Sequence, residues 1–208
     1  MDGTFMRKLW KRVFFCWILT IAFWTGTLIA DKQTLSEELI RFHVIAASDG
    51  SVDQNIKLQV RDAVLKSISQ DLQHMSDVEE AKRYLQENIP KLESIANKVL
   101  SLAGMEDQAQ VSLCKEAFGV RQYDTFSLPA GIYESLKIVI GKGEGENWWC
   151  VAFPSLCLPA TRADFEAAAV SAGFSKPLAK TLTNESRYQF RFFLLDVIGK
   201  IENKWITE

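Results

Sequence analysis

Residues 128–157, LPAGIYESLKIVIGKGEGENWWCVAFPSLC, decide the fold that this sequence predicts. Ile132–Ile140 and Trp148–Phe153 are rich in β-branched and aromatic residues, a composition typical of strands. The glycine-rich segment 141–147 between them supplies turn residues, so the simplest connection is a β-hairpin. The stretch therefore predicts two strands that are neighbours in a sheet.

The rest of the chain adds strands and helices to this pair. Residues 39–47 alternate between two faces, and Ala109, Val111 and Leu113 repeat the alternation, which predicts two further strands. Apolar residues at steps of three and four, or an alanine-rich composition, predict helices over residues 51–72, 76–104, 163–172 and 190–205. Together these elements favour an α/β or α+β fold, a two-layer domain of about four strands packed with helices.

Composition places the chain among folded proteins rather than disordered ones. Of its 208 residues, 48% are hydrophobic and 24% are charged, which is enough apolar material for one domain with a core. The formal net charge is −2, and no basic stripe runs through the body of the chain. Nucleic acid is therefore not the expected partner, because neutralising phosphates requires clustered lysine and arginine.

The N-terminus carries a targeting signal. Val13–Ala30, VFFCWILTIAFWTGTLIA, contains no charged residue, and as a helix it would span about 27 Å, close to the thickness of bilayer hydrocarbon. Basic residues precede it and should stay in the cytoplasm while the rest of the chain faces outward; they are Arg7, Lys8, Lys11 and Arg12. We expect residues 1–30 to be a cytoplasmic tip plus a signal peptide or membrane anchor, residues 31–38 a polar linker, and residues 39–208 an extracytoplasmic domain.

Cys150 and Cys157 are the candidate disulfide of the exported domain. Outside the cytoplasm such a bridge could persist, and closing so small a loop would stabilise the fold by roughly 2–3 kcal/mol. Free buried thiols are the alternative. A redox or metal role is disfavoured, because the cysteines lack the close spacing of a redox motif and no helix start is expected to lower a thiol pKa.

His43 and the tryptophan pair are the other candidates. His43 with Asp49 and Asp53 could perform acid–base chemistry. No serine or cysteine has the sequence context of a nucleophile, however, so no catalytic residues, metal ligands or cofactor are predicted. Trp148 and Trp149 must point to opposite faces of their strand. One is expected in the core, and the other is either covered by a helix or exposed as an anchor for a partner.

Three segments together resemble the stage II sporulation protein R family of endospore-forming bacteria. They are IRFHVIAASDGSVDQNIKLQVRDAVL (40–65), LPAGIYESLKIVIG (128–141) and NWWCVAFPSLC (147–157). Their order, the hydrophobic N-terminal segment and the length of the chain also match, over about residues 5–160. Two positions depart from the family pattern: Ala47 stands where asparagine is usual, and Ser155 where a second proline is usual.

The resemblance implies a signalling protein that is made in the forespore and exported toward the space between the two sporulation membranes. There it would trigger a membrane-embedded protease of the mother cell to process the precursor of sigma factor E. It would act by protein–protein contact, without catalysis of its own and without a small-molecule substrate. Membrane contact would run through residues 13–30, and the candidate contacts with the partner are His43, Asp49, Trp148 and Trp149.

Two other interpretations stay open at this point. One is an extracytoplasmic hydrolase that uses His43 with nearby acidic residues. The other is a structural module of the division septum or the cell wall, which would act stoichiometrically rather than as a trigger.

Overall fold

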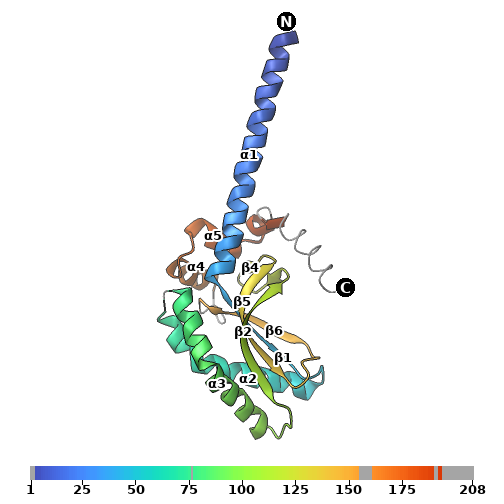
Figure 1. Ribbon diagram of the computed structural model, residues 1–208, viewed down its shortest axis with the longest axis vertical. Helices are drawn as coiled ribbons and strands as arrows, with labels where there is room; N and C mark the ends of the chain where they lie inside the picture. The colour runs from blue at the N-terminus through green and yellow to red at the C-terminus, as the bar shows by residue number, and fades with distance from the viewer. Residues whose placement is uncertain (1–2, 76, 155–160, 190–191, 194–208) are drawn as a thin grey trace.

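The computed structural model describes residues 3–75, 77–154, 161–189 and 192–193. Helices pack on a four-stranded sheet of order β2-β5-β1-β6 (Figure 1), so the predicted fold class is confirmed. The sheet consists of β1 Ile40–Ile45, β2 Ala109–Phe118, β5 Gly131–Ile140 and β6 Asn147–Phe153, and a separate ribbon consists of β3 Arg121–Gln122 and β4 Ser127–Leu128. The helices are α1 Gly3–Glu38, α2 Ser51–Gln73, α3 Val78–Leu102, α4 Arg162–Ser171 and α5 Lys176–Thr183. Most of the helix expected over 190–205 lies outside the described residues.

The order of the strands corrects the predicted hairpin. β1 lies between β5 and β6, pairing parallel with β5 and antiparallel with β6. The segment 141–147 therefore crosses the end of β1 instead of turning tightly, a step of about 10 Å between the strands on either side. Backbone N–H groups of this segment hold it there, since Gly145 donates to the Ala46 carbonyl at 3.0 Å and Glu144 to the Ala47 carbonyl at 3.3 Å. A Cβ at Gly145 would collide with the Ser48 backbone, so the crossing requires glycine.

One face of the sheet carries the main hydrophobic core. Phe42 and Val44 point from β1 to this face, where α2 and α3 cover them completely. Both helices present apolar residues on one side, as an amphipathic helix does. The buried residues of α2 and α3 include Val60, Val64, Ile68, Leu85, Leu92 and Ala96.

Helices cover only part of the opposite face. The end of α1, together with α4 and α5, packs near the start of β1 and the end of β2 (Figure 1). Residues 31–38, for which we expected a polar linker, are the last turns of α1. Leu35 within them is fully buried in this second core, beside Phe165 and Leu182. The chain therefore enters the domain as a helix rather than as an extended linker.

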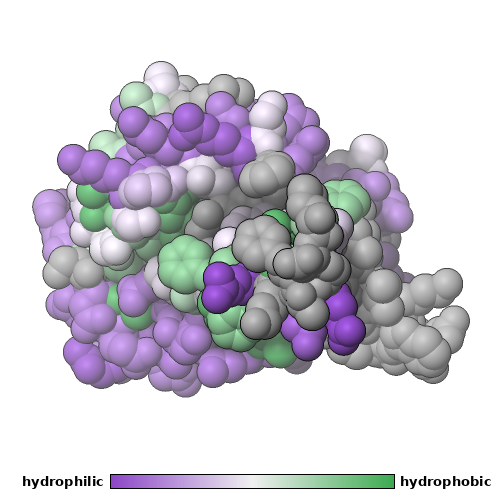
Figure 2. All heavy atoms as spheres, turned by 90° about the horizontal axis from the view of Figure 1, so that it is seen from above, coloured by the Kyte–Doolittle hydropathy of each residue, from purple (hydrophilic) through white to green (hydrophobic). Residues whose placement is uncertain are grey.

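The remainder of α1 projects from the domain as an uninterrupted helix (Figure 1). Its side chains are apolar and exposed, for example Phe23 and Trp17. Among the described residues, α1 is the one helix whose length and composition would allow it to cross a membrane, over Leu9–Glu38. Figure 2, which looks down on the molecule from the end where α1 begins, shows hydrophobic residues near the middle of a largely hydrophilic surface.

Candidate functional site

The part of the second sheet face that α1, α4 and α5 leave uncovered carries polar and aromatic side chains. Alternation along the strands brings them together, because His43 of β1 pairs with Lys137 of β5 on one side and with Trp149 of β6 on the other. Glu116 of β2 and Arg121 of β3 complete the group. We call these five residues the polar sheet face.

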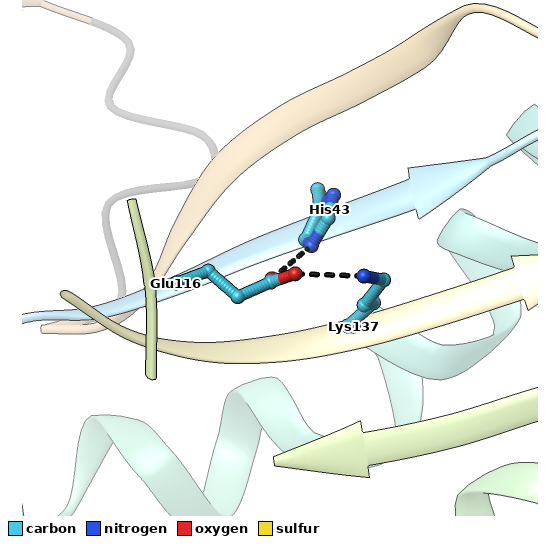
Figure 3. Close-up of polar contacts among 3 residues, drawn as sticks. All are labelled: His43, Glu116 and Lys137. Carbon is cyan, nitrogen blue, oxygen red and sulfur yellow. Dashed lines mark hydrogen bonds and ion pairs between the residues drawn. The ribbon is translucent and has the colours of Figure 1, made fainter. Parts of the chain in front are cut away.

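A shared carboxylate organises the polar sheet face (Figure 3). Glu116 Oε2 lies 2.8 Å from His43 Nε2, and Glu116 Oε1 accepts a hydrogen bond of 2.7 Å from Lys137 Nζ. The His43 side chain is almost completely buried, whereas Glu116 and Lys137 are only partly buried. One anion therefore holds a buried histidine and a surface lysine in fixed positions, and the two cationic partners come from two different strands.

Burial and charge act in opposite directions on these groups. Burial lowers the pKa of His43, and this effect outweighs the hydrogen bond and the charge of Glu116, which raise it. Burial alone would raise the pKa of Glu116, but the hydrogen bonds from Lys137 and His43 bring that pKa below its ordinary value. At neutral pH the histidine is therefore uncharged and the carboxylate ionised, so Nε2–H donates to Glu116 and Nδ1 carries the lone pair.

Aromatic rings line one side of the same face. Trp149 stacks on His43, with ring centroids 4.6 Å apart and an interplanar angle of 2°, and Phe118 meets Trp149 edge-on. The Arg121 guanidinium lies over the Trp149 ring, 4.4 Å from its centroid. Trp149 is partly buried, so its remaining surface is available at the rim of the face. It packs against the second core.

Trp148 points to the other side of the sheet, as the alternation requires. Its ring meets Phe42 edge-on at a centroid distance of 6.0 Å, and the Arg61 guanidinium lies 4.7 Å from its centroid. Like Trp149 it is partly buried. Each tryptophan thus packs on a different core and carries an arginine on its ring.

Arg41 lies on the same side of β1 as His43, two positions nearer the start of the strand, and is completely buried. Its guanidinium carbon lies 4.4 Å from the ring centroid of Phe118 and 5.1 Å from that of Tyr133, and Nη2 donates to the Tyr123 hydroxyl at 2.9 Å. Its Nε and Nη1 have no hydrogen-bond partner. Burial lowers the pKa of Arg41 below its ordinary value, yet among the described residues no carboxylate pairs with it.

The structure does not bring the other sequence candidates to His43. Asp49 accepts a hydrogen bond from the Glu146 backbone N–H at 2.7 Å, and Asp53 accepts one from the Ser48 hydroxyl, so both carboxylates hold the chain near the start of α2. The carboxylate that contacts His43 is Glu116, seventy-three positions away. Asp49 and Asp53 therefore do not form with His43 the acid–base group that the hydrolase interpretation requires.

Of the two cysteines of the candidate disulfide, only Cys150 is among the described residues. Cys150 is buried on the sheet face that α2 and α3 cover, whereas Cys157 lies outside the described residues, so the bridge between them stays a prediction. Cys16 and Cys114 are free thiols. Burial raises the pKa of Cys114, which disfavours the nucleophilic thiolate. Within the described ranges, histidine, cysteine and carboxylate side chains form no cluster that could hold a metal ion.

Acidification is expected to destabilise the fold through this network. The ordinary pKa of His43 is 6.5, and its folded value is lower, so the unfolded chain binds a proton first and stability is lost as the pH falls below about 6.5. Glu116 has a folded pKa below its ordinary 4.5, so its contribution is present above about pH 4.5 and is lost as the pH falls through the folded value.

Urea unfolding at pH values from about 7 to 4 measures this dependence. Glu116→Gln should carry the loss of stability to lower pH, because the variant lacks the carboxylate that raises the pKa of His43 and the folded pKa of His43 falls further. His74→Gln removes the exposed histidine and should leave the curve as it is. An unchanged acidic part of the curve in Glu116→Gln would show that the network does not couple folding to pH.

Comparison with known proteins identifies the family to which these features belong. The family model for stage II sporulation protein R matches residues 36–163, a range that includes every residue of the polar sheet face and Arg41. The stage II sporulation protein R of Bacillus subtilis (strain 168) is 36% identical over 123 residues, which are 59% of this chain and 55% of that protein. The matched region thus spans about half the length of the relative. No solved structure matches the chain.

Proposed function

The chain belongs to the stage II sporulation protein R family, and from this premise we propose that it is an exported signal of sporulation. It is made in the forespore and delivered across the forespore membrane. From the outer side it triggers a membrane-embedded protease of the mother cell, which then processes the precursor of sigma factor E. The chain acts by contact, without catalysis of its own, and the polar sheet face is the surface that meets the protease.

The observation that carries the proposal is the hydrogen-bonded network of His43, Glu116 and Lys137 on the sheet face that α1, α4 and α5 leave partly uncovered. The His43 Nε2–H is directed into Glu116, and Glu116 is also bonded to Lys137. A general base needs a free lone pair within reach of a substrate proton, and the free lone pair of His43 is on Nδ1, which is buried. The network therefore fixes the positions of side chains at the surface, which is what a binding surface requires. Trp149 and Arg121, residue types enriched in binding hot spots, lie at its rim.

The course of α1 supports a retained anchor rather than a cleaved signal peptide. A signal peptide would be cut near Ala30, but the helix runs without interruption from Gly3 to Glu38. Leu28 and Leu35, on either side of that point, are both buried, and Leu35 belongs to the second core. A cut at Ala30 would divide a continuous helix that is already packed.

Sporulating cells that lack their own member of the family provide the test. The full chain made in the forespore should restore processing of the sigma factor E precursor, measured by immunoblot. Ser112→Trp places a bulky side chain at an exposed position beside Lys137 on the open face. We expect it to reduce processing about tenfold or more, the effect of losing about 1.4 kcal/mol of binding.

The matched control is Ser101→Trp, the same change at an exposed position of α3. It should process the precursor as the unchanged chain does. If Ser112→Trp accumulates normally and signals normally, the polar sheet face is not the contact surface. If the unchanged chain accumulates in the forespore and restores nothing, the proposed signalling function is wrong.

A further inference from the structure

The polar sheet face is positively charged, although the chain as a whole is acidic. Three cationic side chains belong to this face or its edge: Arg41 beside Phe118, Arg121 over Trp149, and Lys137, which pairs with the carboxylate of Glu116. The formal net charge of the chain is −2. The cations lie close enough to affect one another. The charge of Arg121 lowers the pKa of Arg41, and the charges of Lys137 and Arg41 lower that of His43. This face therefore has the opposite sign to the rest of the protein.

Unused hydrogen-bonding atoms concentrate at the same place. Arg41 Nε and Nη1, His43 Nδ1 and Ser135 Oγ are buried and have no partner. The register puts Arg41 beside Ser135 in adjacent strands, and His43 follows two positions along β1 on the same side. A buried polar group without a partner costs about 1–3 kcal/mol. Among the described residues nothing offsets this cost by hydrogen bonding, so the positive charge of Arg41 stays uncompensated beneath the surface that a ligand would meet.

We propose that the polar sheet face binds a carboxylate of an acidic segment of the protein partner, held between Arg121 and Lys137 beside the Trp149 ring. The inference rests on the proposed function, since it describes what the partner presents to this site. Arg121 is exposed and has no carboxylate partner among the described residues, so its planar guanidinium can pair with both oxygens of an incoming carboxylate. Arg41, buried two positions before His43 on the same side of β1, adds positive potential, and no carboxylate of the described residues pairs with it.

His43 responds to such a ligand. A carboxylate near its uncharged ring favours protonation, and the proton enters at Nδ1 because Nε2–H remains directed at Glu116. Protonation turns the unused Nδ1 acceptor into a donor. The groups that face this histidine are Glu116 and Lys137 from the neighbouring strands and Arg41 from its own strand.

An acidic protein segment fits this site better than an anionic membrane. β1 leaves the end of α1 at Ile40 and carries His43 away from it (Figure 1). His43 lies five positions beyond Glu38, the last residue of α1, a rise of about 16 Å if the chain is extended. That distance exceeds the screening length of about 8–10 Å in physiological salt. Lipid headgroups around α1 would therefore be screened from His43.

Histidine NMR on the full chain tests the inference, because the chain has only two histidines and the second, His74, serves as an internal reference. The ¹³C-histidine-labelled chain is placed in neutral phosphatidylcholine nanodiscs and titrated with an acetylated, amidated hexaglutamate peptide. We expect the pKa of His43 to rise by about one unit, a tenfold coupling between proton and peptide. The signals of His74 should not respond to the peptide, and hexaglutamine should affect neither histidine.

Arg121→Gln should weaken hexaglutamate binding about fivefold or more, whereas Lys142→Gln, an equal charge change on the exposed connection 141–147, should leave it unchanged. Arg121 makes no ion pair with the described residues, so its loss should not disturb folding, which a melting curve checks. The inference is overturned if hexaglutamate does not shift His43, if hexaglutamine shifts it equally, or if discs containing phosphatidylglycerol shift it without peptide. Should Ser112→Trp block processing while hexaglutamate does not bind, the contact function stands and the acidic partner is wrong.

Discussion

Replacing Phe42 with alanine is expected to lower the free energy of unfolding by about 3–5 kcal/mol. Phe42 is fully buried on β1, the strand that lies between β5 and β6. Its neighbours in the register are Leu136 and Cys150, and its ring meets Trp148 edge-on. Alanine removes the apolar contacts and leaves a cavity that strands on both sides prevent from collapsing. The loss is a large fraction of the 5–15 kcal/mol that stabilises a typical domain.

Urea unfolding followed by circular dichroism measures the change for Phe42→Ala. The control is Ile132→Ala on the neighbouring strand β5, where the side chain is 63% exposed and the expected change is within about 0.5 kcal/mol. A cost for Phe42→Ala as small as that of the control would mean that β1 does not occupy the middle of the sheet.

Leu35→Ala is expected to cost about 2–5 kcal/mol. Leu35 lies in the last turns of α1 and is fully buried in the second core with Phe165 and Leu182. A flexible linker at residues 31–38 would make the same substitution nearly neutral. The expected cost therefore distinguishes a helix that is part of the domain from a tether that only connects it.

The matched control on the same helix is Glu37→Ala. Glu37 is exposed, and its side chain accepts a hydrogen bond from Gln33, a pair worth about 0.2–0.5 kcal/mol. Thermal unfolding of the full chain in detergent, monitored by circular dichroism, compares the two variants. Equal melting temperatures for Leu35→Ala and the unchanged chain would contradict the packing of α1 on the domain.

Periodicity predicted the elements of the fold but not the order of the strands. Alternation in residues 39–47 and 132–140 depends on each strand separately, so the sequence shows it directly. The position of β1 between β5 and β6 is a pairing between distant segments. A glycine-rich segment of seven residues can serve either as a hairpin loop or as a crossing over one strand. Only the contacts of Gly145 with the end of β1 decide between them.

The candidate site was predicted in part for the same reason. His43 and Trp149 attracted attention as single residues, but Glu116 and Lys137 become significant only when β2, β5 and β1 are placed side by side. Asp49 is close to His43 in sequence, yet a turn follows β1 and takes it elsewhere. A more useful signal was present: in β2 and β5 the polar residues Ser112, Glu116 and Lys137 all occur in phase on one side of their strands.

The polar composition of residues 31–38 hid the packing of α1. Charged and polar residues predominate there, which is typical of a linker. Leu28, Leu35 and Leu39, however, are spaced by seven and four positions, the spacing of a single helical face. All three are buried, so a few leucines on one face outweigh the polar majority.

Because α1 is an unbroken helix, it limits how far from the forespore membrane the protease can meet the domain. With residues 13–30 in the forespore bilayer, as proposed, the eight helical residues that follow rise about 12 Å at 1.5 Å per residue, and they already pack on the domain through Leu35. Headgroups occupy most of that height. An unbroken helix cannot bend to move the domain outward, so the domain stays at a constant distance from the forespore membrane. The mother-cell membrane must then approach the forespore membrane before its protease can contact the domain. Signalling therefore depends on the distance between the two membranes.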